Sequence, residues 1–159
     1  MIIICLILKG AYKMNKVFFS KKSDEWETPQ YYFNELNEIY NFTLDPCATK
    51  ENYKCKKYYT IEDNGLLKSW ANERVFVNPP YSKIKLWVEK CYFENKLNNA
   101  FVVLLIPART DTKYFHNYIY NKHQIIFLRG RLKFGNSKNS APFPSMLVIM
   151  NLGGSNNEK

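Results

Sequence analysis

The residues best suited to chemistry in this sequence are Asn78-Pro79-Pro80-Tyr81, which follow the apolar run Val75–Val77. The two prolines fix two φ angles and lack N–H groups, so they predict a rigid turn with outward carbonyls. The asparagine adds an acceptor oxygen, and together these oxygens can accept both hydrogens of an exocyclic amine. Holding the amine in this way pushes its lone pair toward an electrophile, while the tyrosine ring offers a planar base a stacking face. The alternative is an ordinary strand-terminating loop, because Pro-Pro occurs in many loops.

A second polar turn, Asp45-Pro46-Cys47-Ala48, follows the short apolar segment Phe42-Thr43-Leu44. Like the first turn, it is stiffened by proline and stands directly after an expected strand. Both turns are therefore expected to take part in ligand binding.

The apolar spacing predicts three helices that position these turns. The first begins at Thr28-Pro29, with Thr28 as the N-cap and Pro29 in the first turn. The second begins after Ser82, which can cap it, and the third precedes residue 125. Their apolar faces are Tyr32, Phe33, Leu36, Ile39 and Tyr40; Ile84, Trp87, Val88, Cys91 and Tyr92; and Tyr114, Phe115, Tyr118 and Ile119.

Short apolar runs between the helices predict strands at residues 42–44, 75–77, 100–106, 125–128 and 145–150. The run Ala100–Ile106 stops at Pro107, which is typical of a strand buried on both faces of a parallel sheet. Ser145–Met150 is expected to be an antiparallel partner. Strands that alternate with helices predict an α/β fold with ligands at the carboxyl ends of the strands. The two polar turns end such strands and are expected at one binding edge.

The composition fits a single basic, folded domain of 159 residues and 18.9 kDa. Hydrophobic residues make up 46% and aromatic residues 16%, which excludes a disordered chain, and the counts of six Gly and seven Pro exclude a collagen-like chain. The formal charge is +9, with a pI near 9.3. The charge is compatible with a nucleic-acid partner and equally with solubility alone. The four cysteines form no CxxC pair, so we expect reduced cytosolic thiols and no metal site.

The chain ends are expected to lie outside the domain. The apolar run Met1–Leu8 is too short to span a bilayer, and no basic region precedes it as in a signal peptide. Because Met14 is a second plausible start, residues 1–13 are either an upstream extension or an extra edge strand. We expect a single domain over residues 14–152 and a flexible tail over 153–159.

A basic segment covers residues 109–138, with seven basic side chains and one acid. It continues into a loop rich in Gly, Asn, Ser and Pro, which is expected to lie over the binding edge and to contact phosphates. The residues expected to contact a nucleic acid are Arg109, Arg131, Lys133 and, as a second stacking face for a base, Phe134. A solvated run of charges is the alternative.

The ordered set of these motifs resembles the phage-type DNA N6-adenine methyltransferases, over roughly residues 20–150. Within it, Asn-Pro-Pro-Tyr after a strand resembles the catalytic motif of amino-methyltransferases that use S-adenosylmethionine. The residues that carry the resemblance are Trp26-Glu27-Thr28-Pro29, Leu44-Asp45-Pro46-Cys47-Ala48, Glu51-Asn52, Lys54-Cys55, Asp63-Asn64-Gly65-Leu66, Trp70, Val77-Asn78-Pro79-Pro80-Tyr81-Ser82, Trp87 and Gly130-Arg131-Leu132-Lys133-Phe134.

The resemblance implies a Rossmann-like methyltransferase fold, with a mostly parallel sheet, helices on both faces and an antiparallel C-terminal strand. It implies S-adenosylmethionine as the cofactor and double-stranded DNA as the partner, with the target adenine flipped out of the duplex. It also implies an enzyme in the bacterial cytoplasm, encoded by a phage or prophage. The implied catalytic residues are Asn78, Pro79, Pro80 and Tyr81, and the implied cofactor-binding residues are Thr28, Pro29, Asp45, Pro46, Cys47, Ala48 and Asp63.

Other interpretations of these residues stay open at this point. Thr28-Pro29 fits a purely structural helix cap, and Asp63 fits an Asp-Asn-Gly turn. The turn after residue 77 also serves methylation of cytosine N4 or of glutamine amides, since each presents a planar amine. A non-catalytic nucleic-acid-binding module on the same scaffold is a further alternative.

Overall fold

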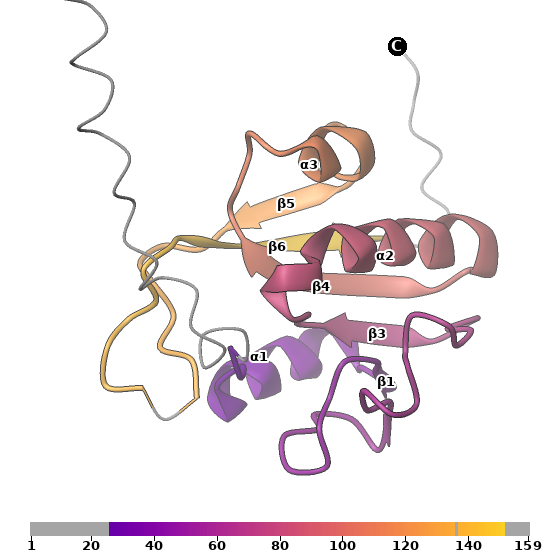
Figure 1. The fold of residues 1–159 in the computed structure, drawn as a ribbon, viewed down its shortest axis with the longest axis horizontal. Coiled ribbons are helices and arrows are strands. Elements are labelled where there is room, and N and C mark those ends of the chain that lie inside the picture. Colours follow the sequence, from indigo (N-terminus) through magenta and orange to yellow (C-terminus); the bar gives the residue numbers. More distant parts are fainter. Residues whose placement is uncertain (1–25, 136, 152–159) are drawn as a thin grey trace, which may run out of the picture.

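A mixed six-stranded sheet is the centre of the computed structural model, which describes residues 26–135 and 137–151 (Figure 1). The strands lie in the order β2-β1-β3-β4-β6-β5. Their bounds are β1 (Leu44–Asp45), β2 (Lys57–Tyr58), β3 (Arg74–Val77), β4 (Phe101–Pro107), β5 (Gln124–Phe127) and β6 (Ser145–Met150). The expected extension at 1–13, the tail at 153–159 and residues 14–25 of the expected domain lie outside the described residues.

Strand direction divides the sheet into two parts. β2, β1, β3 and β4 are parallel neighbours, whereas β6 is antiparallel to both β4 and β5. The α/β class and the antiparallel pairing of residues 145–150 are thereby confirmed. The expected mostly parallel sheet is correct only in part, because two of the five pairings are antiparallel. A wholly apolar run such as β4 has the same pattern in either kind of sheet, so the pattern does not give its direction.

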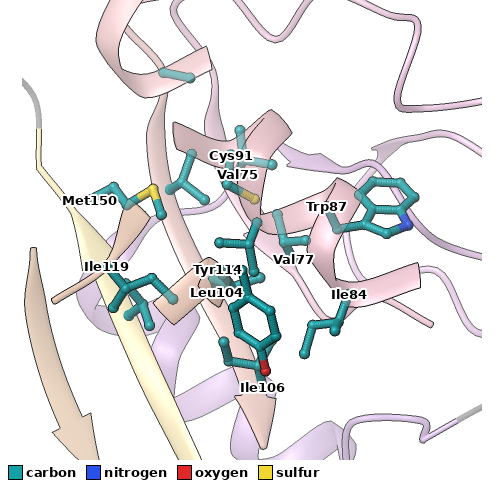
Figure 2. Close-up of a cluster of buried hydrophobic side chains, with 14 of the residues drawn as sticks. Val75, Val77, Ile84, Trp87, Cys91, Leu104, Ile106, Tyr114, Ile119 and Met150 are labelled. Atoms are coloured by element: carbon teal, nitrogen blue, oxygen red, sulfur yellow. The ribbon is translucent and has the colours of Figure 1, made fainter. Parts of the chain in front are cut away.

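Helices cover both faces of the sheet, as expected. α1 (Gln30–Tyr40) packs on one face, and α2 (Ile84–Asn98) and α3 (Lys113–Tyr118) pack on the other (Figure 1). Side chains alternate along β3, so Val75 and Val77 belong to the α2 side and Phe76 to the α1 side. Figure 2 shows the α2 side, where Trp87 and Cys91 join these valines in one buried cluster. In the described part of the chain no helix has the length and apolar character needed to cross a membrane.

The starts of two helices differ from the expected ones. Pro29 is the N-cap of α1, without a side-chain cap hydrogen bond, and Lys83, not Ser82, is the N-cap of α2. A 3₁₀ turn, η3 (Tyr81–Lys83), precedes α2 and carries the chain out of the Pro-Pro turn. The predicted cap at Thr28 is therefore wrong, because this side chain hydrogen-bonds to a residue on a neighbouring turn instead.

Candidate active site

A cavity opens at the carboxyl ends of β1 and β3, the edge where the sequence predicts a ligand. Segments far apart in the sequence form its wall and include Trp26–Thr28, Asp45–Thr49, Asn52, Lys54, Thr60–Ile61, Asn64–Leu66 and Asn78–Pro80. The two polar turns meet there because β1 and β3 are neighbours in the sheet. This is the usual position of a ligand site in an α/β sheet.

The cavity brings together one group of the predicted site residues and leaves the others around it. The residues in its wall are Thr28, Asp45, Pro46, Cys47, Ala48, Asn78, Pro79 and Pro80. The predicted residues that are not part of the wall are Pro29, Asp63, Tyr81, Arg109, Arg131, Lys133 and Phe134.

The side-chain amide of Asn78 is held in one orientation. Its Nδ2 group donates to the carbonyl oxygen of Trp26 and, at 2.9 Å, to Oγ1 of Thr28. The tyrosine hydroxyl of Tyr81 donates to the amide oxygen Oδ1 at 3.4 Å. An amide oxygen has two lone pairs, so Oδ1 can accept one further hydrogen. The arrangement therefore presents an acceptor, not a donor, to an incoming group.

The backbone of the same turn is held by Cys47, whose thiol donates to the carbonyl oxygen of Asn78 at 3.3 Å. Burial is the main reason why the pKa of this thiol lies well above its ordinary value, and the nearby Asp45 raises it further. Cys47 is therefore a neutral donor, unsuited to nucleophilic chemistry, which requires a thiolate.

Asp45 organises the loop that follows β1. Its two carboxylate oxygens accept the backbone N–H of Cys47 at 3.3 Å and that of Lys54 at 3.1 Å. Burial raises the pKa of this carboxyl to about 6, although both backbone hydrogen bonds act in the opposite direction. Residues 45–49 include no glycine. The buried carboxylate of Asp45 fixes the conformation of the loop after β1 by accepting two of its backbone N–H groups.

The segment after β2 packs tightly against this loop. A Cβ added to Gly65 would lie 2.0 Å from the carbonyl oxygen of Pro46, so only glycine fits there. Asp63 is exposed, and its carboxylate accepts hydrogen bonds from the N–H and the hydroxyl of Thr60, both at 2.9 Å. These bonds lower the pKa of Asp63. Asp63 thus shapes the segment whose neighbouring residues line the cavity.

Aromatic rings gather beside the Asn78 turn. Trp26 lies stacked with Tyr81 at 6.4 Å between ring centroids and meets Phe134 and Phe143 edge-on at 5.5 and 5.0 Å. Phe134 is only 4% exposed, so its ring packs in this cluster and offers no open face in this conformation. Sequence reasoning named Trp26 only among the residues that carry the family resemblance and did not name Phe143, because an aromatic residue in a loop carries no periodic signal.

The basic loop lies next to the cavity. The N–H of Gly135 donates to the carbonyl oxygen of Glu27 at 2.7 Å, and the N–H of Ala141 donates to that of Leu132 at 2.8 Å. Arg131 and Lys133 are exposed on this loop. Arg109, also exposed, follows the end of β4. The described structure thus joins part of the predicted basic segment to the residues that hold Asn78.

The mixed α/β sheet, in which β6 runs antiparallel to its neighbours β4 and β5, and the Asn-Pro-Pro-Tyr turn after β3 are consistent with a methyltransferase fold. Residues 17–153 match the model of the family described as DNA N-6-adenine-methyltransferase (Dam). The chain belongs to this family and is an adenine-specific DNA methyltransferase. The resemblance expected from the motifs is thereby confirmed.

Similar proteins come from phages and from a bacterium. A DNA N-6-adenine-methyltransferase of Haemophilus phage HP1 (strain HP1c1) is 32% identical over 140 residues, which cover 82% of this chain and 81% of that protein. A protein of the same name from Escherichia phage T1 is 34% identical over 111 residues, covering 69% of this chain and 46% of that protein. The putative methyltransferase YfdM of Escherichia coli (strain K12) is 35% identical over 80 residues, 46% of this chain and 82% of that protein.

Proposed function

We propose that this protein transfers a methyl group from S-adenosylmethionine to N6 of an adenine flipped out of double-stranded DNA. The observation that carries the proposal is the fixed amide of Asn78. Because its N–H groups already have acceptors at Trp26 and Thr28, its oxygen is directed to accept a hydrogen of the target amine. The carbonyl of Pro79 accepts the second hydrogen in this proposal.

The residues of the wall suit the proposed cofactor. Ile61 and Leu66 offer apolar surface for a nucleoside, while Lys54 and the buried Asp45 offer charges for an amino-acid group. When bound, S-adenosylmethionine supplies a methyl group activated by a positively charged sulfur. The chain itself contributes by orienting the amine. When both N–H groups of the amine donate hydrogen bonds to the protein, the nitrogen lone pair is directed toward the methyl group. The proton lost from the amine passes to solvent.

The aromatic cluster supports the capture of a flipped base. Tyr81 is partly buried, and burial is the main reason why the pKa of its phenol is raised. The ring therefore stays neutral and suits stacking, which contributes about 1–3 kcal/mol per base in single-strand binding sites. Trp26 stacks with this ring and Phe143 meets it edge-on, so both contribute to holding it in place.

The exposed residues Arg109, Arg131 and Lys133 are proposed to contact DNA phosphates. Their basic side chains suit this role, since neutralising phosphates releases counterions and favours binding. Two of the similar proteins come from phages, so we also propose that the enzyme acts on DNA in the cytoplasm of a bacterial host.

The experiment that tests this function identifies the methylated nucleoside. Unmethylated duplex DNA is incubated with the protein and S-adenosylmethionine, digested to nucleosides and separated by chromatography with mass detection. We expect N6-methyldeoxyadenosine as the product. N4-methyldeoxycytidine would contradict the proposed target, and no methylated nucleoside at all would contradict the proposed reaction.

A further inference from the structure

Lys54 lies in the wall of the cavity with a buried side chain, and the proposed function assigns its charge to the amino-acid end of the cofactor without naming the group that it binds. Its side chain is only 7% exposed. Its ammonium donates to Oε1 of Gln30 at 3.1 Å and reaches Oε1 of Glu27 at 3.5 Å. A buried charge is costly unless it is paired and hydrogen-bonded, so its presence beside a ligand cavity calls for a reason.

The side chains around Lys54 hold its ammonium at the wall. The amide group of Gln30 donates from Nε2 to Oδ1 of Asn34 at 2.9 Å, which turns its oxygen toward the lysine. The backbone N–H of Lys54 is fixed by Asp45 at the other end of the residue. The ammonium is therefore placed by both its backbone and its head group, as expected of a residue that binds a ligand.

The charges near Lys54 leave room for an anion. Glu27 is its nearest carboxylate, but the 3.5 Å separation is long for a charge-assisted hydrogen bond and the glutamate is 44% exposed. An ammonium has three N–H donors, and Gln30 and Glu27 are its two hydrogen-bond partners among residues 26–135 and 137–151. The first turn of α1, which begins at Gln30, holds no acidic residue, so its N-terminal end also favours a negative group.

We propose that Lys54 binds the carboxylate of the amino-acid end of the cofactor, an inference that rests on the proposed function. The nearby Glu27 gives this part of the cavity one positive and one negative charge, which complements an α-amino carboxylate. Ile61 and Leu66 occupy the segment after β2 and suit the nucleoside instead. Lys54 thereby distinguishes ligands that carry the carboxylate from ligands that lack it.

Calorimetric binding to wild type, Lys54→Met and the matched surface variant Lys56→Met tests this role. The ligands are S-adenosylhomocysteine and 5′-methylthioadenosine, which lacks the amino-acid end. We expect Lys54→Met to weaken S-adenosylhomocysteine binding by about ten- to hundredfold, as for a lost hydrogen bond to a charged group. Binding of 5′-methylthioadenosine should be unchanged, Lys56→Met should resemble wild type, and Lys54→Arg should restore most of the affinity.

Two results would overturn the inference. One is equal affinity of wild type and Lys54→Met for S-adenosylhomocysteine, and the other is an equal loss for both ligands, which indicates a structural role. If the Lys54→Met variant does not fold, binding to the wild-type protein is compared for S-adenosylmethionine and its decarboxylated form. We expect S-adenosylmethionine to bind at least tenfold more tightly. Equal binding of the two ligands would contradict the role of Lys54. A wild type that binds none of these ligands would overturn the proposed function itself.

Discussion

The two halves of the sheet are built in different ways. β4 and β6 pair over six residues each, and every residue of both strands is buried. β1 and β2 have two residues each and pair over two positions. In this second half, few backbone groups are paired between strands, and side chains bind some of the others. The carboxylates of Asp45 and Asp63, for example, accept hydrogen bonds from backbone N–H groups of the neighbouring loops. The antiparallel half thus supplies stability, while the short-strand half supplies a site whose shape depends on individual polar side chains.

The largest effect is expected in the buried half. Leu104 in β4 is 0% exposed, so Leu104→Ala removes well-packed atoms and leaves a cavity. We expect a loss of about 2–5 kcal/mol in the free energy of unfolding, measured by urea denaturation. Ile61→Ala, at a residue that is 88% exposed in the cavity segment, is the control and should change stability little. Similar losses for both variants would contradict the division between the halves.

Asn78→Ala should act on the reaction and leave the fold intact. It removes the acceptor oxygen but keeps the prolines that shape the turn. The rate of methyl transfer to DNA should fall by about a hundred- to a thousandfold, as when one preorganised hydrogen-bonding group is lost elsewhere. Asn117→Ala, at an exposed position on α3, serves as the control. A folded Asn78→Ala protein with near wild-type transfer would exclude the proposed mechanism.

The two halves should also respond to acid with opposite signs. Burial lowers the pKa of His123, just before β5, to about 4. The folded protein therefore favours the neutral imidazole, and the free energy of unfolding decreases as pH falls below 6.5. Burial raises the pKa of Asp45 to about 6, so its protonated form favours folding and this contribution is lost as pH rises through 6. The change for the buried Asp45 amounts to about 1–3 kcal/mol, and the change for the partly exposed His123 is smaller because solvent screens its charge. In urea denaturation at pH 7 and 4.5, His123→Gln should therefore lose less stability on acidification than wild type, and an equal loss would contradict the assignment.

A smaller effect is expected at Thr28, whose hydroxyl accepts a hydrogen from the Asn78 amide. Thr28→Val keeps the shape of this buried side chain but removes that acceptor, so the amide is held by Trp26 alone. The kcat should fall by about three- to tenfold with little change in the KM for the cofactor, and Thr28→Ser should restore it. A raised cofactor KM with an unchanged kcat would instead support the direct cofactor contact predicted from the sequence.

Much of the frame could be predicted because long periodic segments such as α1, α2 and β4 leave a clear apolar pattern. β2 could not, since two residues with one exposed side chain carry no pattern. The local turn after β3 was predicted, but its support was not, because Trp26 and Thr28 lie about fifty residues away and meet it only in the fold. The burial of Phe134 likewise depends on Trp26 and Phe143, which are distant in sequence or in another part of the loop.

The contact between Gly65 and Pro46 restricts how this enzyme can vary. The restriction is steric, because the neighbour that an added Cβ would meet is a backbone carbonyl, which cannot rotate away as a side chain can. A substitution at position 65 is therefore accommodated only if the loop after β1 moves as well. Substitutions in the two loops that border the cavity therefore depend on each other. A library of variants that changes both loops together should contain more folded proteins than a library that changes either loop alone.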